Sequence, residues 1–123
     1  MILVDTSIWI DHLRQGDELL SELLGMGQVL AHPHVVGELA LGNLKDRNLV
    51  LDALKDLPQV PVARDDEVLR FIEVNALFGM GIGYIDAHLL GAVRLAPGTR
   101  LWTRDKCLHA ASTSLDLAYI VTH

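Results

Sequence analysis

Short apolar runs alternate along this chain with stretches in which apolar residues recur every three or four positions. The first pattern is typical of buried strands, and the second of helices with one face on a core. Their alternation predicts βα units and a parallel sheet. We expect strands over residues 2–4, 29–31, 60–63, 100–103 and 118–121.

The helical stretches begin and end at residues that suit helix termini. Pro33 suits a first helical turn, and Pro97 with Gly98 ends the helix before it. The helix that opens at Asp65 and Asp66 is expected to turn Val68, Leu69, Ile72 and Leu77 inward. The remaining helices are expected over residues 7–13, 17–25, 33–44, 46–57, 85–93 and 105–111.

The first run is the most informative, because Ile2, Leu3 and Val4 lead directly into Asp5. Sites in open α/β sheets form beyond the carboxyl ends of the strands. Asp105 follows the expected strand over residues 100–103 in the same way. We therefore expect Asp5 and Asp105 to lie at one edge of the sheet.

Composition fits one globular domain over residues 1–123, since half the residues are hydrophobic and 21% are charged. The mean hydropathy of +0.31 is high for a lone domain and indicates a surface that a partner covers. The net charge of −6 argues against a generic nucleic-acid binder but not against an enzyme that gathers carboxylates around metal ions. The single cysteine, Cys107, is expected in the core and suits a reducing cytoplasm.

Residues 76–92 are apolar enough for a membrane span to be considered. Asp86 and His88 lie inside this stretch, and a central Asp costs roughly 2.5–3.5 kcal/mol on insertion scales. Three glycines also interrupt it. We expect a loop followed by a core helix, with no membrane association.

Two further carboxylates, Glu38 and Asp86, lie on expected helices with apolar residues one turn away. Side chains three and four residues apart share a helix face, so both carboxylates are expected toward the core. Burying several carboxylates is costly unless a positive charge joins them. Mg²⁺ prefers oxygen ligands, and a site with open positions activates water at a phosphodiester. Thr6 and Thr103 are expected to orient these ligands.

Each carboxylate also has a simpler local interpretation. Asp5 and Asp105 are favourable N-caps, Asp86 suits a first helical turn, and Glu38 suits a half-exposed helix position. Arg104 and Lys106 flank Asp105 and suit RNA phosphates, or else a solvated surface. Structural or exposed roles are expected for the histidines at positions 32, 34 and 88 rather than a shared transition metal.

Four segments together resemble the PIN-domain family, and in particular its VapC-type toxins. They are Val4-Asp5-Thr6-Ser7-Ile8-Trp9-Ile10, Val36-Gly37-Glu38-Leu39, Gly83-Tyr84-Ile85-Asp86-Ala87-His88-Leu89-Leu90 and Leu101-Trp102-Thr103-Arg104-Asp105. The likeness spans essentially the whole chain in matching order and spacing. The run over residues 79–83 is richer in glycine than the family pattern.

The resemblance implies a three-layer α/β/α PIN-like fold around a short, mostly parallel central sheet. It implies a Mg²⁺- or Mn²⁺-dependent endoribonuclease with Asp5, Glu38, Asp86 and Asp105 around the metal. It also implies a cytoplasmic toxin that forms a homodimer and is neutralised by a VapB-like antitoxin.

Two other classes of function stay open at this point. A haloacid-dehalogenase-like phosphatase or a receiver domain also places Asp after a strand. The former, however, needs a second Asp where Ser7 stands, and the latter needs one at the end of a middle strand, where Arg64 intervenes. The other alternative is a PIN-like binding module without catalysis, although all four acidic positions are present.

Overall fold

A computed structural model describes residues 1–121 and contains a three-stranded parallel sheet in the order β2-β1-β3. The strands are β1 (Ile2–Val4), β2 (Val29–Leu30) and β3 (Arg100–Trp102). Leu3 and Val4 are fully buried, as expected for a central parallel strand covered on both faces. Leu3 pairs with Leu30 on one side and with Leu101 on the other.

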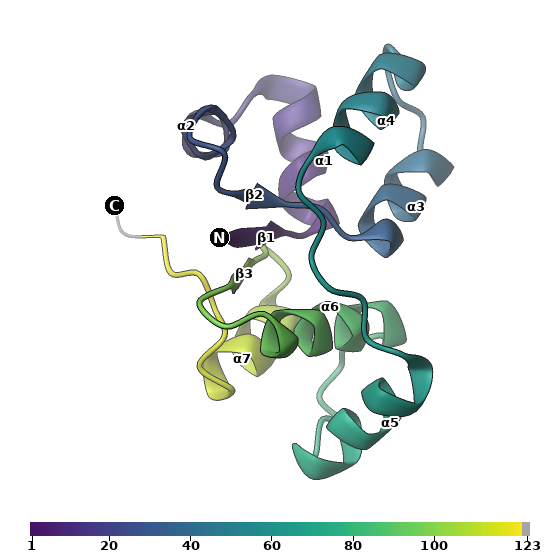
Figure 1. Ribbon diagram of the computed structural model, residues 1–123, viewed down its shortest axis with the longest axis vertical. Coiled ribbons are helices and arrows are strands. Elements are labelled where there is room, and N and C mark those ends of the chain that lie inside the picture. The colour runs from purple at the N-terminus through teal and green to yellow at the C-terminus, as the bar shows by residue number, and fades with distance from the viewer. Residues whose placement is uncertain (122–123) are drawn as a thin grey trace.

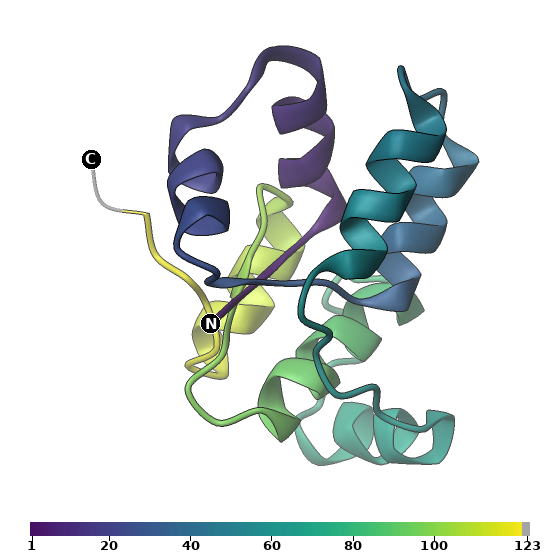
Figure 2. The same cartoon turned by 45° about the horizontal axis from the view of Figure 1, so that its top comes forward.

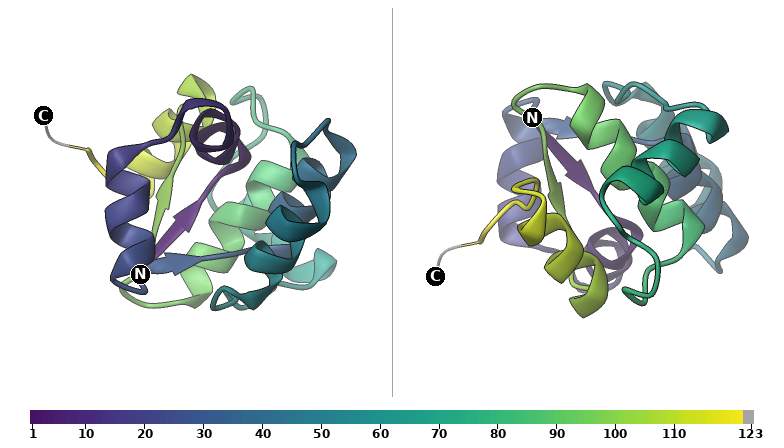
Figure 3. Two further views of the ribbon diagram at one scale, coloured as in Figure 1. Left: turned by 90° about the horizontal axis from the view of Figure 1, so that it is seen from above. Right: turned by 90° about the horizontal axis from the view of Figure 1, so that it is seen from below.

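Seven helices surround the sheet in the described part of the chain, and they leave the carboxyl ends of the strands at one edge. They are α1 (Thr6–Gln15), α2 (Glu18–Gly25), α3 (Pro33–Leu41), α4 (Arg47–Asp56), α5 (Asp65–Val74), α6 (Tyr84–Leu95) and α7 (Lys106–Ser114). Helices α1 and α2 cover one face, and α6 and α7 cover the other (Figures 1 and 3). Helix α5 packs outside α6, and α3 and α4 lie side by side next to α1 (Figure 2). The predicted α/β/α layering and parallel sheet are confirmed.

Helix α6 is the central helix of the fold, because every residue from Ala87 to Val93 is buried. No helix among residues 1–121 has the length and apolar character needed to cross a bilayer, so the expected core helix is confirmed over residues 84–95. Asp86 belongs to the first turn of this helix and therefore lies beside the sheet edge.

Two of the predicted strands are wrong, because each region contributes only one isolated bridge to the sheet. Residues 60–63 contribute no strand, since only Gln59 bridges Ala31, and Pro61 has no N–H to continue a ladder. Residues 118–121 contribute one bridge from Ala118 to Leu101. Strand β3 ends at Trp102, so Ile120 and Val121 lie beyond the end of the strand that Ala118 bridges.

Several other boundaries and orientations also differ from the expectations. Helix α3 ends at Leu41 instead of residue 44, because Gly42 leaves the helical conformation. Leu69 is 57% exposed although it was expected inward, and Leu77 is buried but lies after the end of α5. Cys107 is exposed rather than a core residue.

Candidate active site

Asp5 directly follows β1, and two hydroxyl groups hold its side chain. Its Oδ2 atom accepts hydrogen bonds from Ser7 Oγ at 2.9 Å and from Thr103 Oγ1 at 2.7 Å. The residue is only 6% exposed, and its side chain makes no capping hydrogen bond to α1. Asp5 therefore occupies the N-cap position of α1, as the simpler interpretation expects, but its side chain does not cap the helix.

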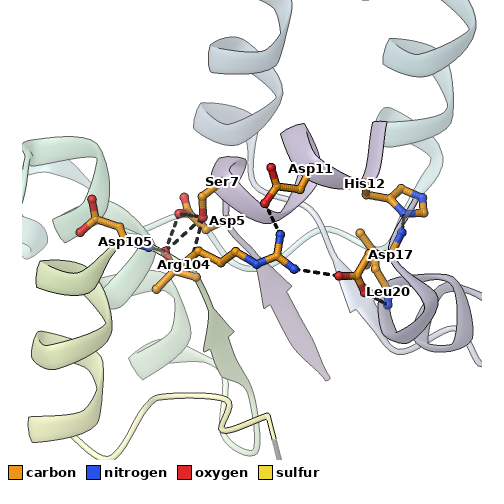
Figure 4. A network of polar contacts seen from close by, with 9 residues as sticks. Asp5, Ser7, Asp11, His12, Asp17, Leu20, Arg104 and Asp105 are labelled. Atoms are coloured by element: carbon orange, nitrogen blue, oxygen red, sulfur yellow. Dashed lines mark hydrogen bonds and ion pairs between the residues drawn. The ribbon is translucent and has the colours of Figure 1, made fainter. Parts of the chain in front are cut away.

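Thr103 joins the ends of β1 and β3. Besides donating to Asp5, its buried hydroxyl accepts a hydrogen bond from the backbone N–H of Asp105 at 3.1 Å. Ser7 completes the connection, because its Oγ accepts from the backbone N–H of Arg104 at 3.1 Å. These bonds fix the turn that carries Asp105 against the start of α1 (Figure 4).

Asp105 is the N-cap of α7, with Oδ1 accepting a hydrogen bond from Leu108 N–H at 2.9 Å. Its local role as a cap is confirmed. The side chain remains exposed at the same sheet edge as Asp5. Capping and a role at the sheet edge are thus compatible for this carboxylate.

Glu38 projects from α3 and is exposed, so its expected orientation toward the core is wrong. Its Oε1 atom accepts a hydrogen bond from Thr6 Oγ1 at 2.9 Å. Thr6 is the first residue of α1 and directly follows Asp5. This bond ties α3 to the end of β1 and brings Glu38 to the edge where Asp5 lies.

Asp86 is half-buried, and its Oδ2 accepts a hydrogen bond from Gly83 N–H at 3.1 Å. Burial raises the pKa of Asp86 above its usual value, and the negative charges of Asp5, Asp105 and Glu38 raise it further. The Gly83 hydrogen bond offsets part of this rise. All three of the other predicted carboxylates therefore lie near enough to Asp86 for their charges to act on it.

The glycine-rich loop before α6 has a conformation that explains its composition. Gly79 and Gly81 have φ values of 75° and 77°, in the left-handed region that favours glycine. A Cβ on Gly81 would also lie 3.1 Å from Cys107 Sγ. The loop thus packs against the start of α7 and delivers Gly83 to the N-terminus of α6.

Each of the four carboxylates has one oxygen engaged by the protein, while its other oxygen receives no hydrogen bond from residues 1–121. The engaged atoms are Asp5 Oδ2, Glu38 Oε1, Asp86 Oδ2 and Asp105 Oδ1. None of the four forms an ion pair with a residue in that range. The site is therefore a set of hard oxygen donors whose mutual repulsion no Lys or Arg relieves, and this donor set fits Mg²⁺ or Mn²⁺.

The four side chains are not yet closed around a common point. Among the described residues, no three His, Cys, Asp or Glu side chains are drawn together as ligands of one ion. Asp86 and Asp105 instead turn toward the first turns of their own helices.

Arg104 lies between the carboxylates of Asp11 and Asp17. Its guanidinium forms ion pairs with Asp11 and, at 2.8 Å, with Asp17, whose Oδ1 caps α2 by accepting from Leu20 N–H (Figure 4). The sequence analysis missed these partners, which lie 93 and 87 residues away and share no local pattern with it. Lys106, in contrast, is exposed and forms no ion pair within residues 1–121.

The three histidines gather behind the site, with the His34 and His88 rings 4.7 Å apart and the His32 and His34 rings 4.9 Å apart. His32 caps α3 by accepting the His34 N–H on Nδ1, and its proton therefore lies on Nε2. That nitrogen is buried without a partner among the described residues and carries a proton instead of a metal-binding lone pair. This arrangement supports the structural role expected for His32.

Two proteins of Mycobacterium tuberculosis, from strains CDC 1551 / Oshkosh and ATCC 25618 / H37Rv, are each 54% identical to this chain over 118 residues. The match covers 96% of this chain and 95% of each relative, and both relatives are named Ribonuclease VapC32. The chain belongs to the VapC family. No protein-family model matches it.

Membership of the VapC family confirms the resemblance that the four motifs carried. It also replaces the aspartate-phosphorylated alternatives, whose patterns the chain fitted poorly. The sequence analysis gave no role to Ser7, which bonds Asp5 and the backbone of Arg104, although a hydroxyl two residues after Asp5 was a usable signal.

Proposed function

We propose that this VapC-family chain is one nuclease domain over residues 1–123 and hydrolyses RNA phosphodiester bonds with Mg²⁺ or Mn²⁺. The observation that supports this most is the set of four carboxylates, each of which keeps one oxygen free of protein hydrogen bonds and forms no ion pair within residues 1–121. Burial of Asp86 and the charges of the other three raise its pKa, as expected where carboxylates gather without a cation. The names of the two M. tuberculosis relatives support the choice of RNA as substrate.

In this proposal Asp5, Glu38, Asp86 and Asp105 hold the ion through their unengaged oxygens. A bound divalent ion supplies a water of lowered pKa and stabilises the charge that develops on the phosphodiester. Ser7 and Thr103 keep Asp5 in one orientation, and Thr6 does the same for Glu38. Side chains that are held before the ion arrives lose less conformational entropy when they bind it.

The remaining expectations belong to the same proposal. The chain acts in the cytoplasm, forms a homodimer and is neutralised by a VapB-like antitoxin. Large apolar side chains on the surface support a covering partner, among them Leu41, Leu49 and Val74, which are 91%, 73% and 71% exposed.

Cleavage of a fluorescent single-stranded RNA by the purified chain tests the proposal. We expect activity in Mg²⁺ or Mn²⁺, none in EDTA, and recovery when the metal is restored. Asp86→Asn should abolish activity, because it replaces a charged metal ligand with a neutral amide of similar size. Asp52→Asn is the matched control, since Asp52 is an exposed carboxylate on α4, and it should leave activity unchanged. EDTA-resistant cleavage, or full activity in Asp86→Asn, contradicts the proposal.

A further inference from the structure

A groove of about 530 Å³ lies beside the carboxylate site. Its volume falls within the usual range for small-molecule sites of about 300–1,000 Å³. The groove begins at the sheet edge and follows the start of α7. Its polar and aromatic lining residues are Trp102, Thr103, Arg104, Lys106, His109, Tyr119 and Asp17, the last of which is paired with Arg104.

The groove adjoins the proposed active site through two residues, although none of the four carboxylates lines it. Thr103 lines it, and the same residue donates the 2.7 Å hydrogen bond to Asp5. Lys106 also lines it and directly follows Asp105. A chain-like ligand with a reacting group at the carboxylates therefore has a path into the groove.

Among residues 1–121, Lys106 is the lysine or arginine that lines this groove without an ion pair. Arg104 is neutralised by Asp11 and Asp17, whereas Lys106 is exposed and forms no ion pair with any residue the structure describes. The chain as a whole carries a charge of −6, so a polyanion needs a specific place to approach. Lys106 provides a positive charge next to the carboxylates, at the point where a phosphate neighbouring the reacting one would lie.

The groove also offers an aromatic ring. Tyr119 is partly exposed, and its ring meets the buried Trp102 ring edge-on, with 5.7 Å between centroids. The Tyr119 backbone N–H is fixed to Leu101 O at 2.8 Å. A ring held in this way is a stacking platform for a base, and base stacking is the usual means of binding single-stranded RNA.

We propose that this groove binds the nucleotide adjacent to the scissile phosphate, with Lys106 on a phosphate and Tyr119 stacked on the base. The proposal rests on the ribonuclease function proposed above. It places RNA in the groove, and not a protein segment, because a cation beside an aromatic ring matches a nucleotide and that cation, Lys106, directly follows Asp105.

Steady-state cleavage of a short single-stranded RNA by the full chain tests this assignment. We expect Lys106→Ala to raise KM several-fold and to reduce the slope of log KM against log salt by about 0.7, as for one lost phosphate contact. Tyr119→Leu should raise KM by at least about five-fold, as expected for the loss of base stacking. Both variants should keep kcat within about two-fold, because neither residue touches the carboxylates.

Lys55→Ala is the matched control, since it removes one exposed lysine from α4, away from the groove. It should match the wild type in KM and salt slope. Unchanged KM and salt slope in Lys106→Ala overturn the groove assignment, whatever the folding state of Tyr119→Leu. Impaired self-association or antitoxin binding in Lys106→Ala with normal KM also overturns it, in favour of a protein occupant.

The same assay separates the two proposals. If Asp86→Asn is inactive while the groove variants behave as the wild type, only the groove assignment fails. If the wild type cleaves no RNA with Mg²⁺ or Mn²⁺, the proposed function itself fails.

Discussion

The hydroxyl of Thr103 donates a 2.7 Å hydrogen bond to Oδ2 of Asp5 and thereby joins two strand ends that are 98 residues apart in the sequence. Both residues are buried, with 7% and 6% of their surface exposed. The bond leaves the other oxygen of Asp5 without a protein donor among the described residues. Thr103 thus orients a proposed metal ligand without serving as one.

Thr103→Val should lower cleavage activity by about 10–100-fold, the usual effect of losing a group that orients a metal ligand. It should also reduce the free energy of unfolding by about 1–3 kcal/mol, because the Asp105 N–H and Asp5 lose a buried partner. Thr103→Ser retains the hydroxyl and should restore most activity. Activity equal to wild type in Thr103→Val would show that the hydrogen bond has no part in catalysis.

Asp105 combines two roles that substitution separates. Asn is an N-cap about as good as Asp, so Asp105→Asn should unfold at nearly the wild-type denaturant midpoint but lose most activity. Asp105→Ala should lose activity and also about 1 kcal/mol of stability, because the Leu108 N–H loses its partner. Urea unfolding and RNA cleavage on the two variants measure this difference. An active Asp105→Asn would leave Asp105 with its capping role alone.

Arg104 is predicted to stabilise the fold and not to bind RNA. Its guanidinium bridges Asp11 on α1 and Asp17 at the start of α2. A double-mutant cycle of Arg104→Ala with Asp17→Asn should give a coupling of about 0.5–1 kcal/mol, typical of a half-exposed pair, since Asn keeps the α2 cap. The salt slope of KM should stay at its wild-type value in Arg104→Ala. A slope reduced by about 0.7 would instead make Arg104 a phosphate ligand.

His32 makes the stability of the fold depend on pH. Burial lowers the pKa of His32 from 6.5 to about 4, with smaller contributions from the charges of His34 and His88. Its Nδ1 already accepts the His34 N–H, so protonation there would break the cap of α3. Between pH 6.5 and about 4 the unfolded chain binds a proton that the folded chain does not. Stability from this group is therefore complete at pH 7 and falls by about 3 kcal/mol as the pH drops through that window.

His32→Asn tests this assignment, because Asn caps a helix and does not titrate. Urea unfolding of both proteins at pH 7, 5.5 and 4.5 should show a shallower loss of stability on acidification in the variant. Comparing how steeply the free energy of unfolding falls with pH cancels the pH-independent loss of stability caused by the smaller side chain. Parallel curves would mean that His32 titrates normally in the folded protein.

The sequence patterns predicted most of the fold, because each helix and each of the three strands carries its own local signal. Ile2-Leu3-Val4 reads as a central strand, and Asp17 indicates the start of α2 that it does cap. The two failed strands lacked information of this kind. Residues 60–63 have strand-like side chains, but Pro61 lacks the N–H needed to extend the bridge between Gln59 and Ala31 into a strand.

The candidate site was predicted in its members but not in its connections. Strand ends and motif spacing identified Asp5, Glu38, Asp86 and Asp105. The hydroxyl network from Ser7 through Thr103, and the engagement of Arg104 by distant carboxylates, depend on tertiary packing that no local pattern contains. The exposure of Glu38 could not be predicted for the same reason. Val35, one helical turn before it, is buried, but the packing around α3 leaves Glu38 itself exposed.

A crystal of the protein soaked in Mn²⁺ and measured for anomalous scattering tests the central claim most directly, because it does not depend on knowing the RNA substrate. We expect an anomalous peak bounded by Asp5, Glu38, Asp86 and Asp105, with the Asp86 carboxylate turned toward the ion. The peak should be lost in Asp86→Asn and retained in Asp52→Asn. The absence of any peak between the four carboxylates at saturating Mn²⁺ would contradict the account.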